Sequence, residues 1–356
     1  MDKNKKLVPT CIIYIDGVRL NVDCEGAFRS IVVIDPLCNV GECTVTFDFY
    51  ELGEDNIQMF QSSFFSNLSV HLGYKDDLSE VFNGRVTRSG INHPEYGPSL
   101  YKLTATSYLS VLEHGKHTRT FENIAPYQAV KKTLGRYGLQ VDCEQFGAEI
   151  PYWQSKEKTD FKTVRDIAKY YGRDIRCSGK KVYVKELMTT LKDEHIYEWG
   201  KSLIAFEVKE SVMEQVRGIR VIGWNIEQAE AVSGEAKIEG LRQKIGGGRP
   251  WRETVANKGE KWVNQYHYVW DHKVKDASQA KEIAEGLLRE KSFNYMRAGG
   301  SGEGNQRLTA GATVTVKYTG ASWDGEYIAH TVIHRFSLEE GYTTEFYLKR
   351  NMANDG

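Results

Sequence analysis

The stretch LTAGATVTVKYTGASWDGEYIAHTVIHRFSLEEGYTTEFYLK, residues 308–349, decides the fold. Thr, Val, Ile, Tyr and Phe alternate with polar residues at a period of two, and glycines interrupt the runs, which is typical of antiparallel strands joined by short turns. We expect a first strand that carries Val314 and Val316, a second over 327–337 and a third over 344–348. Gly325 supplies the positive φ angle that a tight turn needs. The stretch holds no catalytic motif, so we predict a closing sheet with a structural role.

Length and charge bound what the whole chain can be. With 356 residues it can bury roughly three quarters of its unfolded surface and is expected to form more than one domain. The 47 basic and 48 acidic residues give a formal charge of -1, so recognition of a nucleic-acid sequence is not expected. The chain has no run of 18 or more apolar residues, and its start, MDKNKKLVPT, is charged. We therefore predict neither a membrane span nor a secretory signal, and expect synthesis and assembly in a cytoplasm.

Metal, disulfide and cofactor sites are not predicted. Among the six cysteines only Cys38 and Cys43 come close in sequence, and no histidine neighbours them, so small buried thiols are the favoured interpretation. His114 and His117 lack a third ligand at helical spacing and are expected in a solvated loop. The glycines at 246–248 precede a proline instead of the helix that a phosphate-binding loop requires.

Three domains are predicted from the order of the patterns. Residues 7–115 form short strands at intervals near ten residues, which favours a sandwich or barrel. Residues 116–195 combine two amphipathic helices, the second capped by Thr159, with a hairpin. Residues 196–350 return to strands, with an inserted polar loop at about 227–261, a helix over 276–289 and a flexible linker at 298–305. The expected fold is mainly β with an α+β insertion.

Several short patterns together resemble the tail and baseplate hub family of contractile phages and injection systems. The family includes late control protein D of temperate phages and the hub part of the type VI valine-glycine repeat spike protein. The resemblance covers residues 9–350 and follows the family's order. The matching positions in the first two domains are Phe82, Gly84, Val86, Arg119, Thr120, Phe121, Asn123, Tyr152, Gln154, Asp160, Phe161 and Gly172. The matching positions in the last domain are Gly223, Trp224, Gly311, Thr313, Gly320, Gly325, Val332, His334, Phe336, Gly341, Tyr342, Thr344 and Phe346.

The resemblance implies two barrel-like, tube-type domains that flank a mixed helix-hairpin domain. It also implies a non-enzymatic structural role. Three copies would form a homotrimeric ring that joins a trimeric spike protein to a hexameric inner tube or tube-initiator protein, in contact with other baseplate proteins. Such a particle, a phage tail or a phage-tail-like device, would be assembled in the bacterial cytoplasm. Exposed strand edges provide a physical route to the trimer, because their unpaired backbone groups favour pairing with a neighbour. The predicted interface residues are Tyr318, Trp323, Tyr327, Phe336, Tyr342 and Phe346.

Two other functions remain open from the sequence. A tail-associated cell-wall hydrolase would need a paired acid site, a Cys/His pair or a zinc set, and no spaced constellation in the sequence supplies one. Glu122 with Asp142 or Glu144 could be combined as an acid pair, but surface charge is the favoured interpretation. A peptidoglycan- or glycan-binding module would use aromatic rings as a stacking platform, for which Tyr152, Trp153 and Tyr170 are candidates. Packing in a core or interface is the commoner fate of such rings.

Overall fold

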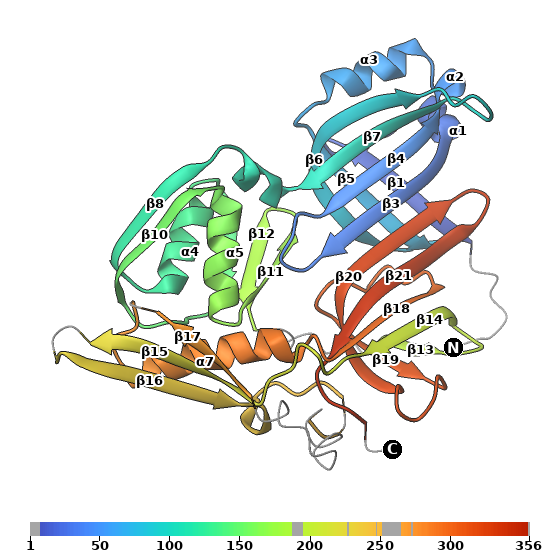
Figure 1. Cartoon of the computed structure of the whole chain (residues 1–356). Helices are drawn as coiled ribbons and strands as arrows, with labels where there is room; N and C mark the ends of the chain where they lie inside the picture. The colour runs from blue at the N-terminus through green and yellow to red at the C-terminus, as the bar shows by residue number, and fades with distance from the viewer. Residues whose placement is uncertain are drawn as a thin grey trace.

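A 13-stranded sheet is the largest feature of the computed structural model, which describes residues 8–186, 195–225, 228–246, 248–250, 265–271 and 273–354. Three smaller sheets and the longest helices lie to one side of it (Figure 1). The large sheet has the strand order β14-β18-β21-β20-β3-β4-β7-β6-β5-β1-β2, with β19 and β13 branching from β20. The prediction of a mainly β fold with helices in the middle of the chain is confirmed.

The N-terminal half contributes seven strands to this sheet. Asp16 and Gly17 both have positive φ angles, 48° and 79°, so the predicted tight hairpin between the first two strands is confirmed. Inward-facing Val33, Val45 and Phe47 belong to an apolar core. The strands are β1 (Pro9–Ile15), β2 (Val18–Arg19), β3 (Phe28–Pro36), β4 (Glu42–Asp48), β5 (Asn67–Tyr74), β6 (Asp77–Asn92) and β7 (Leu100–Ser107). The short helices are α1 (Val22–Ala27), α2 (Phe49–Leu52) and α3 (Glu54–Ser62).

The C-terminal half contains the predicted closing strands. They are β19 (Thr313–Lys317), β20 (Gly325–Ser337) and β21 (Gly341–Arg350), and β20 pairs with both of the others. The remaining strands here are β13 (His195–Glu198), β14 (Leu203–Glu210) and β18 (Met296–Glu303). The linker predicted at 298–305 is wrong, because most of it lies in β18, paired between β14 and β21. The rings of Phe346 and Tyr197 lie over this strand, and a Cβ on Gly300 or Gly302 would come within 2.7 and 2.4 Å of them.

The two halves form one continuous sheet because β3 pairs with β20. Ser30 lies opposite Ser337 and Pro36 opposite Thr331. Both edges of β3 are thereby occupied, by β4 and β20, so β3 is not available to β1 or β2 for closing a barrel around the N-terminal half. The expected barrel closure is therefore wrong for the described residues: the sheet stays open and ends at β14, at β2 and, on the branch from β20, at β13.

The middle part of the chain packs two helices against two small sheets. Thr159 caps α5 by accepting a hydrogen bond from the Lys162 amide (3.1 Å), as predicted. The buried Asp160 accepts two bonds from Arg119 (2.8 and 2.7 Å) and so fixes the start of the helix to β8. The elements are η1 (Tyr108–Glu113), β8 (His117–Ile124), α4 (Pro126–Gly135), β9 (Gln140–Cys143), β10 (Ile150–Lys158), α5 (Asp160–Tyr170), β11 (Asp174–Ser178) and β12 (Lys181–Lys185).

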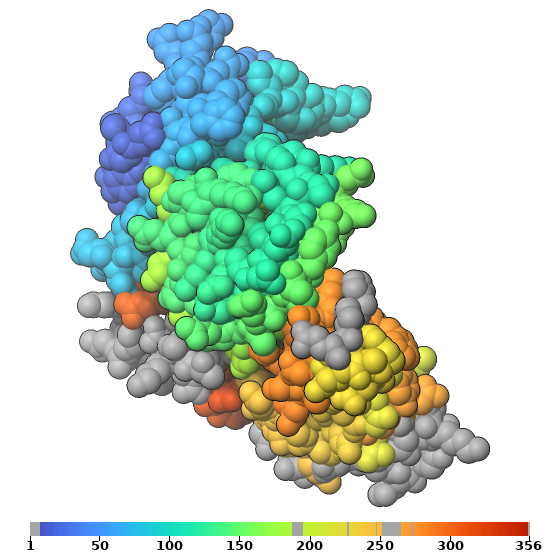
Figure 2. Space-filling model, turned by 90° about the vertical axis from the view of Figure 1, so that its left-hand side faces the viewer, coloured from blue at the N-terminus to red at the C-terminus, as the bar shows by residue number. Residues whose placement is uncertain are grey.

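A three-stranded sheet covered by α7 completes the molecule. Figure 2 shows the middle part between the N-terminal strands and this sheet. Residues 230–237 were predicted as polar loop but form a strand, while 227, 247 and 251–261 lie outside the described residues. The strand forms because α7 packs closely against it at Gly234, a contact that the sequence does not reveal. A Cβ on Gly234 would lie 2.1 Å from the Lys281 amide nitrogen. The elements are β15 (Gly218–Asn225), β16 (Glu230–Lys237), η2 (Ile238–Gly240), β17 (Tyr266–Trp270) and α7 (Ala277–Ser292). Among the described residues, no helix has the length and apolar character needed to span a bilayer.

Candidate functional site

The connection between β19 and β20, residues 318–324, presents two of the predicted interface residues to solvent. We call these residues the tip loop. Tyr318 is 65% exposed and has a φ of 67°, and Trp323 is 41% exposed. Lys201 lies over the Tyr318 ring at 5.9 Å, and the exposed Trp199 donates its backbone N–H to the Lys317 carbonyl (3.0 Å). The loop therefore places aromatic rings and a cation together at one end of the C-terminal half, a composition typical of protein interfaces.

Asp324 and Arg350 hold the tip loop in place through hydrogen bonds to its backbone. The Asp324 carboxylate accepts hydrogen bonds from the Tyr318 amide (3.0 Å) and the Thr319 amide (2.7 Å). Burial alone would raise the pKa of this carboxyl, but the hydrogen bonds outweigh burial, so the pKa lies below its usual value. The fully buried Arg350 donates to the carbonyls of Asp324 and Ser322, both at 2.9 Å. The sequence gives no signal for this role of Arg350, because it depends on a loop far away in the chain.

The other four predicted interface residues lie inside the molecule. Tyr327 lies beneath Arg350, whose guanidinium is 4.7 Å from the centre of the ring. Phe346 contacts the Tyr197 ring at 4.7 Å between centroids. Phe336 and Tyr342 belong to the core of the N-terminal half. Sequence alternation groups such residues on one face of a strand but does not say what covers that face.

Phe336 and Tyr342 pack the two halves of the large sheet together. The Phe336 ring lies 5.9 Å from Phe28, and the Tyr342 ring lies 5.8 Å from Tyr74. The Tyr342 hydroxyl is hydrogen-bonded to Nδ1 of the buried His334 at 2.8 Å. Burial lowers the pKa of His334 to about 4, so the ring is neutral at pH 7. The contact surface that these residues build is therefore one between the two halves of the same chain.

A second contact ties the β5–β6 hairpin to the segment that follows β18. The Tyr74 hydroxyl donates to the Gly304 carbonyl (3.1 Å), and Gln306 donates to the Asp77 carbonyl (3.2 Å). Arg307 forms an ion pair with Asp77 at 3.1 Å. Together with the β3–β20 ladder, these bonds hold the two halves at two places, which favours a rigid unit.

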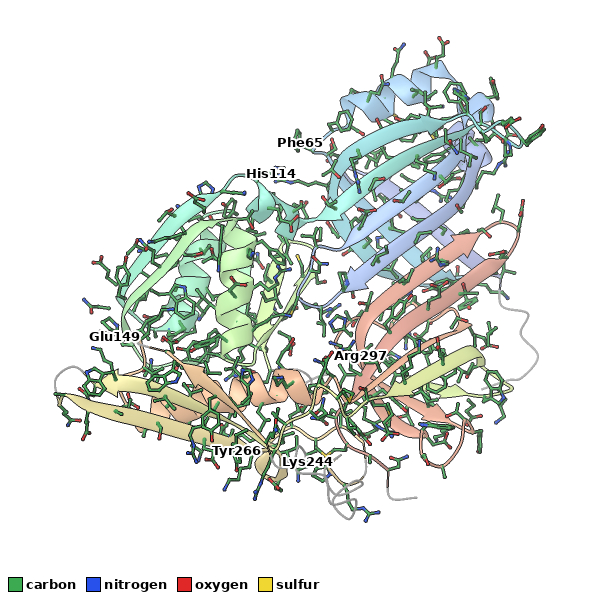
Figure 3. All side chains as sticks on the ribbon, in the orientation of Figure 1. Phe65, His114, Glu149, Lys244, Tyr266 and Arg297 are labelled. Carbon is green, nitrogen blue, oxygen red and sulfur yellow. The ribbon has the colours of Figure 1, made fainter. Side chains whose placement is uncertain are left out.

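The structure does not bring together the residues considered for catalysis or metal binding. Asp142 pairs with Lys185 (3.0 Å), Glu144 lies 3.5 Å from Arg173, and Glu122 is exposed on β8. His114 is exposed at the end of η1 (Figure 3). Among the described residues, no group of three His, Cys, Asp or Glu side chains is arranged to hold a metal ion.

Of the three aromatic residues considered for glycan binding in the middle part, Tyr152 is 43% exposed, whereas Trp153 and Tyr170 are engaged within the chain. Lys273 lies over the Trp153 ring at 4.0 Å, and Trp153 contacts Tyr170 edge to face at 5.9 Å. The Tyr170 hydroxyl donates to Asp271, which follows β17. These contacts join the middle part to the β15–β17 sheet and leave little ring surface of Trp153 and Tyr170 for a ligand.

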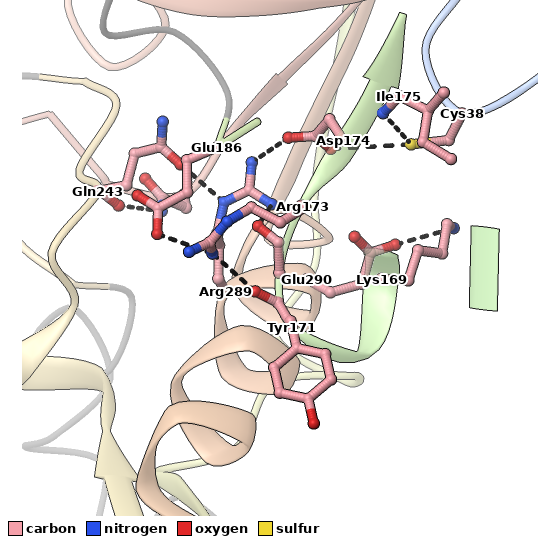
Figure 4. Close-up of polar contacts among 12 residues, drawn as sticks. Cys38, Lys169, Tyr171, Arg173, Asp174, Ile175, Glu186, Gln243, Arg289 and Glu290 are labelled. Carbon is pink, nitrogen blue, oxygen red and sulfur yellow. Dashed lines mark hydrogen bonds and ion pairs between the residues drawn. The ribbon is translucent and has the colours of Figure 1, made fainter. Parts of the chain in front are cut away.

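Arg289 on α7 is the central polar residue of the junction between the middle part and α7. Its buried guanidinium donates to the Gln243 side chain (2.7 Å), to the Gly172 carbonyl (2.9 Å) and to Asp174 (Figure 4). Beside it, Cys38 and Ile175 exchange hydrogen bonds, the Cys38 amide donating at 2.8 Å and its sulfur accepting at 3.3 Å. Three distant segments therefore meet here, and sequence reasoning missed the site because Arg289 lies on a predicted helix face without a local partner.

A polar cleft of about 770 Å³ opens beside Arg289, between α7 and the end of β16. Four of its charged residues are paired within the chain: Arg242 with Glu285 (3.0 Å) and Arg173 with Glu186 (3.0 Å). Leu241 and Leu288 provide a small apolar floor.

Comparison with models of protein families assigns the chain to a family. A family model described as the Alg8 N-terminal domain matches residues 5–338. The chain belongs to the Alg8 N-terminal domain family. This name differs from the one suggested by the sequence patterns, so the resemblance to late control protein D remains a prediction. No curated protein sequence matches this member of the Alg8 N-terminal domain family.

Solved structures show that the Alg8 N-terminal domain fold is shared with tail proteins. The 43 kDa tail protein of prophage MuSo2 from Shewanella oneidensis is similar with a TM-score of 0.66 and 11% identity, over 96% of this chain and 98% of that one. A tail protein from Neisseria meningitidis has a TM-score of 0.68 and 9% identity, over 97% of both chains. The E. coli c3393 protein, a component of the type VI secretion system, has a TM-score of 0.62 and 9% identity, over 95% of this chain and 76% of that one. At these identities the likeness is one of fold.

Proposed function

We propose that the chain is a structural, non-enzymatic hub protein of a phage tail or a phage-tail-like injection particle, comparable to the late control protein D family. The observation that carries the proposal is the fold, which two tail proteins share over at least 96% of this chain and 97% of their own. A structural role is supported by the ion pairs that engage Asp142 and Glu144 and four charged residues of the cleft. The particle would be assembled in the bacterial cytoplasm.

The oligomer that we propose is a homotrimeric ring. Within the described residues the large sheet ends at β14, at β2 and, on the branch that leaves β20 through β19, at β13. Open edges of this kind favour pairing with another chain, and a head-to-tail contact closes into a ring when the rotation fits. Ile204, which is 59% exposed on β14, would lie at such a contact. Each copy brings two sheet halves, so three copies would present six comparable units to a hexameric inner tube.

The tip loop is the surface that we propose for a second protein of the particle, the trimeric spike, the tube-initiator protein or another baseplate protein. Of the predicted interface residues, Tyr318 and Trp323 would contact the partner directly. Tyr327, which donates a hydrogen bond to the Trp323 carbonyl (2.5 Å), would support the loop. Phe336, Tyr342 and Phe346 would act by keeping the two halves rigid. The domain division at 7–115, 116–195 and 196–350 belongs to the same proposal.

Light scattering of the purified chain, alone and with the spike protein encoded beside it, tests the proposal. We expect three times the 40.5 kDa chain mass in at least one condition. An Ile204→Lys variant should lower that mass, because it places a charge at the open edge. Tyr96→Lys, at an exposed position in the β6–β7 connection, is the matched control and should leave the mass unchanged. A strict monomer in both conditions would contradict the ring, and clearing of a cell-wall suspension by that monomer would favour a hydrolase.

A further inference from the structure

The β15–β17 sheet has one face covered by α7 and one face open to solvent. Ile219 and Val221 point toward α7 and are buried. The alternate residues, Arg220 and Trp224, point the other way. On β17, Tyr268 lies opposite Arg220 and Trp270 opposite Ile222, so their rings join the open face. We call Arg220, Trp224, Tyr266, Tyr268 and Trp270 the aromatic face.

The aromatic face exposes large ring surfaces on a fixed support. Trp270 is 74% exposed, Tyr268 56% and Trp224 47%. Tyr266 packs against Gly218, where a Cβ would come within 2.7 Å of the ring, on the side of the sheet away from α7 (Figure 3). Rings at alternate positions of a strand are spaced by about 6.6 Å. Because the opposite face is packed against a helix, the spacing of the rings is set by the sheet.

The charges of the aromatic face lie between the rings, where Glu235 balances one of the two cations Arg220 and Lys237. Glu235 on β16 accepts hydrogen bonds from Arg220 Nε (3.0 Å) and from the Tyr266 hydroxyl (3.1 Å), and it pairs with Lys237 (3.2 Å). The Arg220 guanidinium lies within 5.9 and 6.0 Å of the Tyr266 and Tyr268 ring centres. Hydrogen-bond donors and acceptors are thus available beside the rings without a large net charge.

We propose that the aromatic face binds a neutral glycan chain of β-linked hexopyranose units. The face of an aromatic ring carries partial negative charge, and the flat side of such a sugar presents partially positive C–H groups, so the two are complementary. Rings at alternate positions of β17 present successive stacking surfaces along one line, as a chain of sugar units requires. The mixed polar groups around Arg220 and Glu235 suit hydroxyls, which donate and accept.

Two other ligand classes fit the aromatic face less well. A single-stranded nucleic acid would need a basic groove beside the stacking rings, but Glu235 balances much of the positive charge of Arg220 and Lys237. The centre of a protein–protein interface usually combines such rings with a well-packed pocket. Here the surface of the sheet is open, and β15 contributes a single aliphatic side chain to it, that of Ile222. The glycan proposal does not depend on the hub function.

Calorimetric titration of the full chain with hexasaccharides of β-1,4-linked N-acetylglucosamine and of glucose tests the proposal, with tryptophan fluorescence as a second readout. We expect saturable binding and a blue shift of the emission for at least one of them. Trp270→Ala and Tyr268→Leu should each weaken binding about tenfold, since each removes a stacking ring. Tyr268→Phe keeps the ring and should bind nearly as well as the parent chain.

Trp199→Ala is the matched control, because Trp199 is about half exposed on the large sheet and does not belong to the aromatic face. Circular dichroism of each variant checks that the fold is retained. Absence of heat and of a fluorescence shift with both sugars would overturn the proposal, as would equal binding by Trp270→Ala. A change of particle mass in Trp270→Ala without sugar binding by the parent chain would also overturn it and assign the face to a protein partner.

Discussion

Gly172 and Gly286 lie backbone to backbone where the turn after α5 meets α7. A Cβ on Gly172 would be 2.7 Å from the Gly286 Cα, and a Cβ on Gly286 would be 2.6 Å from the Gly172 amide nitrogen. Side chains larger than hydrogen would separate the two elements at this point. The approach brings Arg289, one helical turn further along α7, within reach of the Gly172 carbonyl. The polar junction therefore depends on two glycines from different parts of the chain.

Replacing Gly286 by alanine should lower the free energy of unfolding by about 2 kcal/mol, because the added methyl group overpacks a backbone contact. This net change already includes the gain in helix propensity from glycine to alanine, about 1 kcal/mol, which offsets only part of the cost of overpacking. Urea unfolding followed by circular dichroism measures the change. Gly135→Ala on α4 is the control, since nothing lies within 4 Å of a Cβ there, and it should be neutral or stabilising. Equal stability of the two variants would contradict the close approach.

Arg350→Met should destabilise the chain by about 3 kcal/mol, because it removes a buried cation that donates to the carbonyls of Asp324 and Ser322. The tip loop should also lose protection against amide hydrogen exchange. Arg335→Met is a suitable comparison: its ion pair with Glu345 is solvent-accessible, so the expected cost is below about 1 kcal/mol. Unchanged exchange in the tip loop of Arg350→Met would show that the loop does not rely on this side chain.

Acid should weaken the junction between the two halves through His334. Burial lowers the pKa of this ring to about 4 from an ordinary value of 6.5. The unfolded chain therefore binds a proton more readily, and the stability contribution, complete above pH 6.5, is lost as the pH falls toward 4. The loss approaches about 3 kcal/mol, at 1.36 kcal/mol per pKa unit. Urea unfolding of the parent chain and of His334→Gln between pH 7.5 and 4.5 measures it; parallel stability curves would rule out His334 as the cause.

Local patterns predicted the elements that local chemistry determines. The Asp16–Gly17 turn, the Thr159 cap and the three closing strands each depend on residues close together in sequence. The strand at 296–303 was missed because glycines ordinarily weaken strands, and the reason for them here lies in the rings of Tyr197 and Phe346. The β3–β20 pairing joins strands about 300 residues apart and leaves no local signal.

The candidate site was predictable only in part for the same reason. Turn residues such as Tyr318 and Trp323 are recognisable from the Asp324 and Gly325 pair that follows them, and turns lie on the surface. Alternation on β21 groups Tyr342 with Phe346 but cannot tell a face that packs against the N-terminal half from one that is free. Arg350 and Arg289 donate hydrogen bonds to carbonyl and carboxylate oxygens of segments that are distant in sequence. Patterns of residue spacing within one segment cannot reveal such contacts.

The thiols of Cys38 and Cys177 should react slowly in the folded chain. Burial raises the pKa of Cys38 and of Cys177 to about 12, so little of the nucleophilic thiolate is present at pH 8. We expect labelling by a disulfide reagent at pH 8 to be at least about tenfold slower in the folded chain than in urea, where the pKa returns to about 8.5. Cys38→Ser should remove one slow thiol and weaken the contact with Ile175, whose amide donates to the sulfur. Fast labelling of Cys38 in the native chain would mean that β11 separates from the segment after β3 under native conditions.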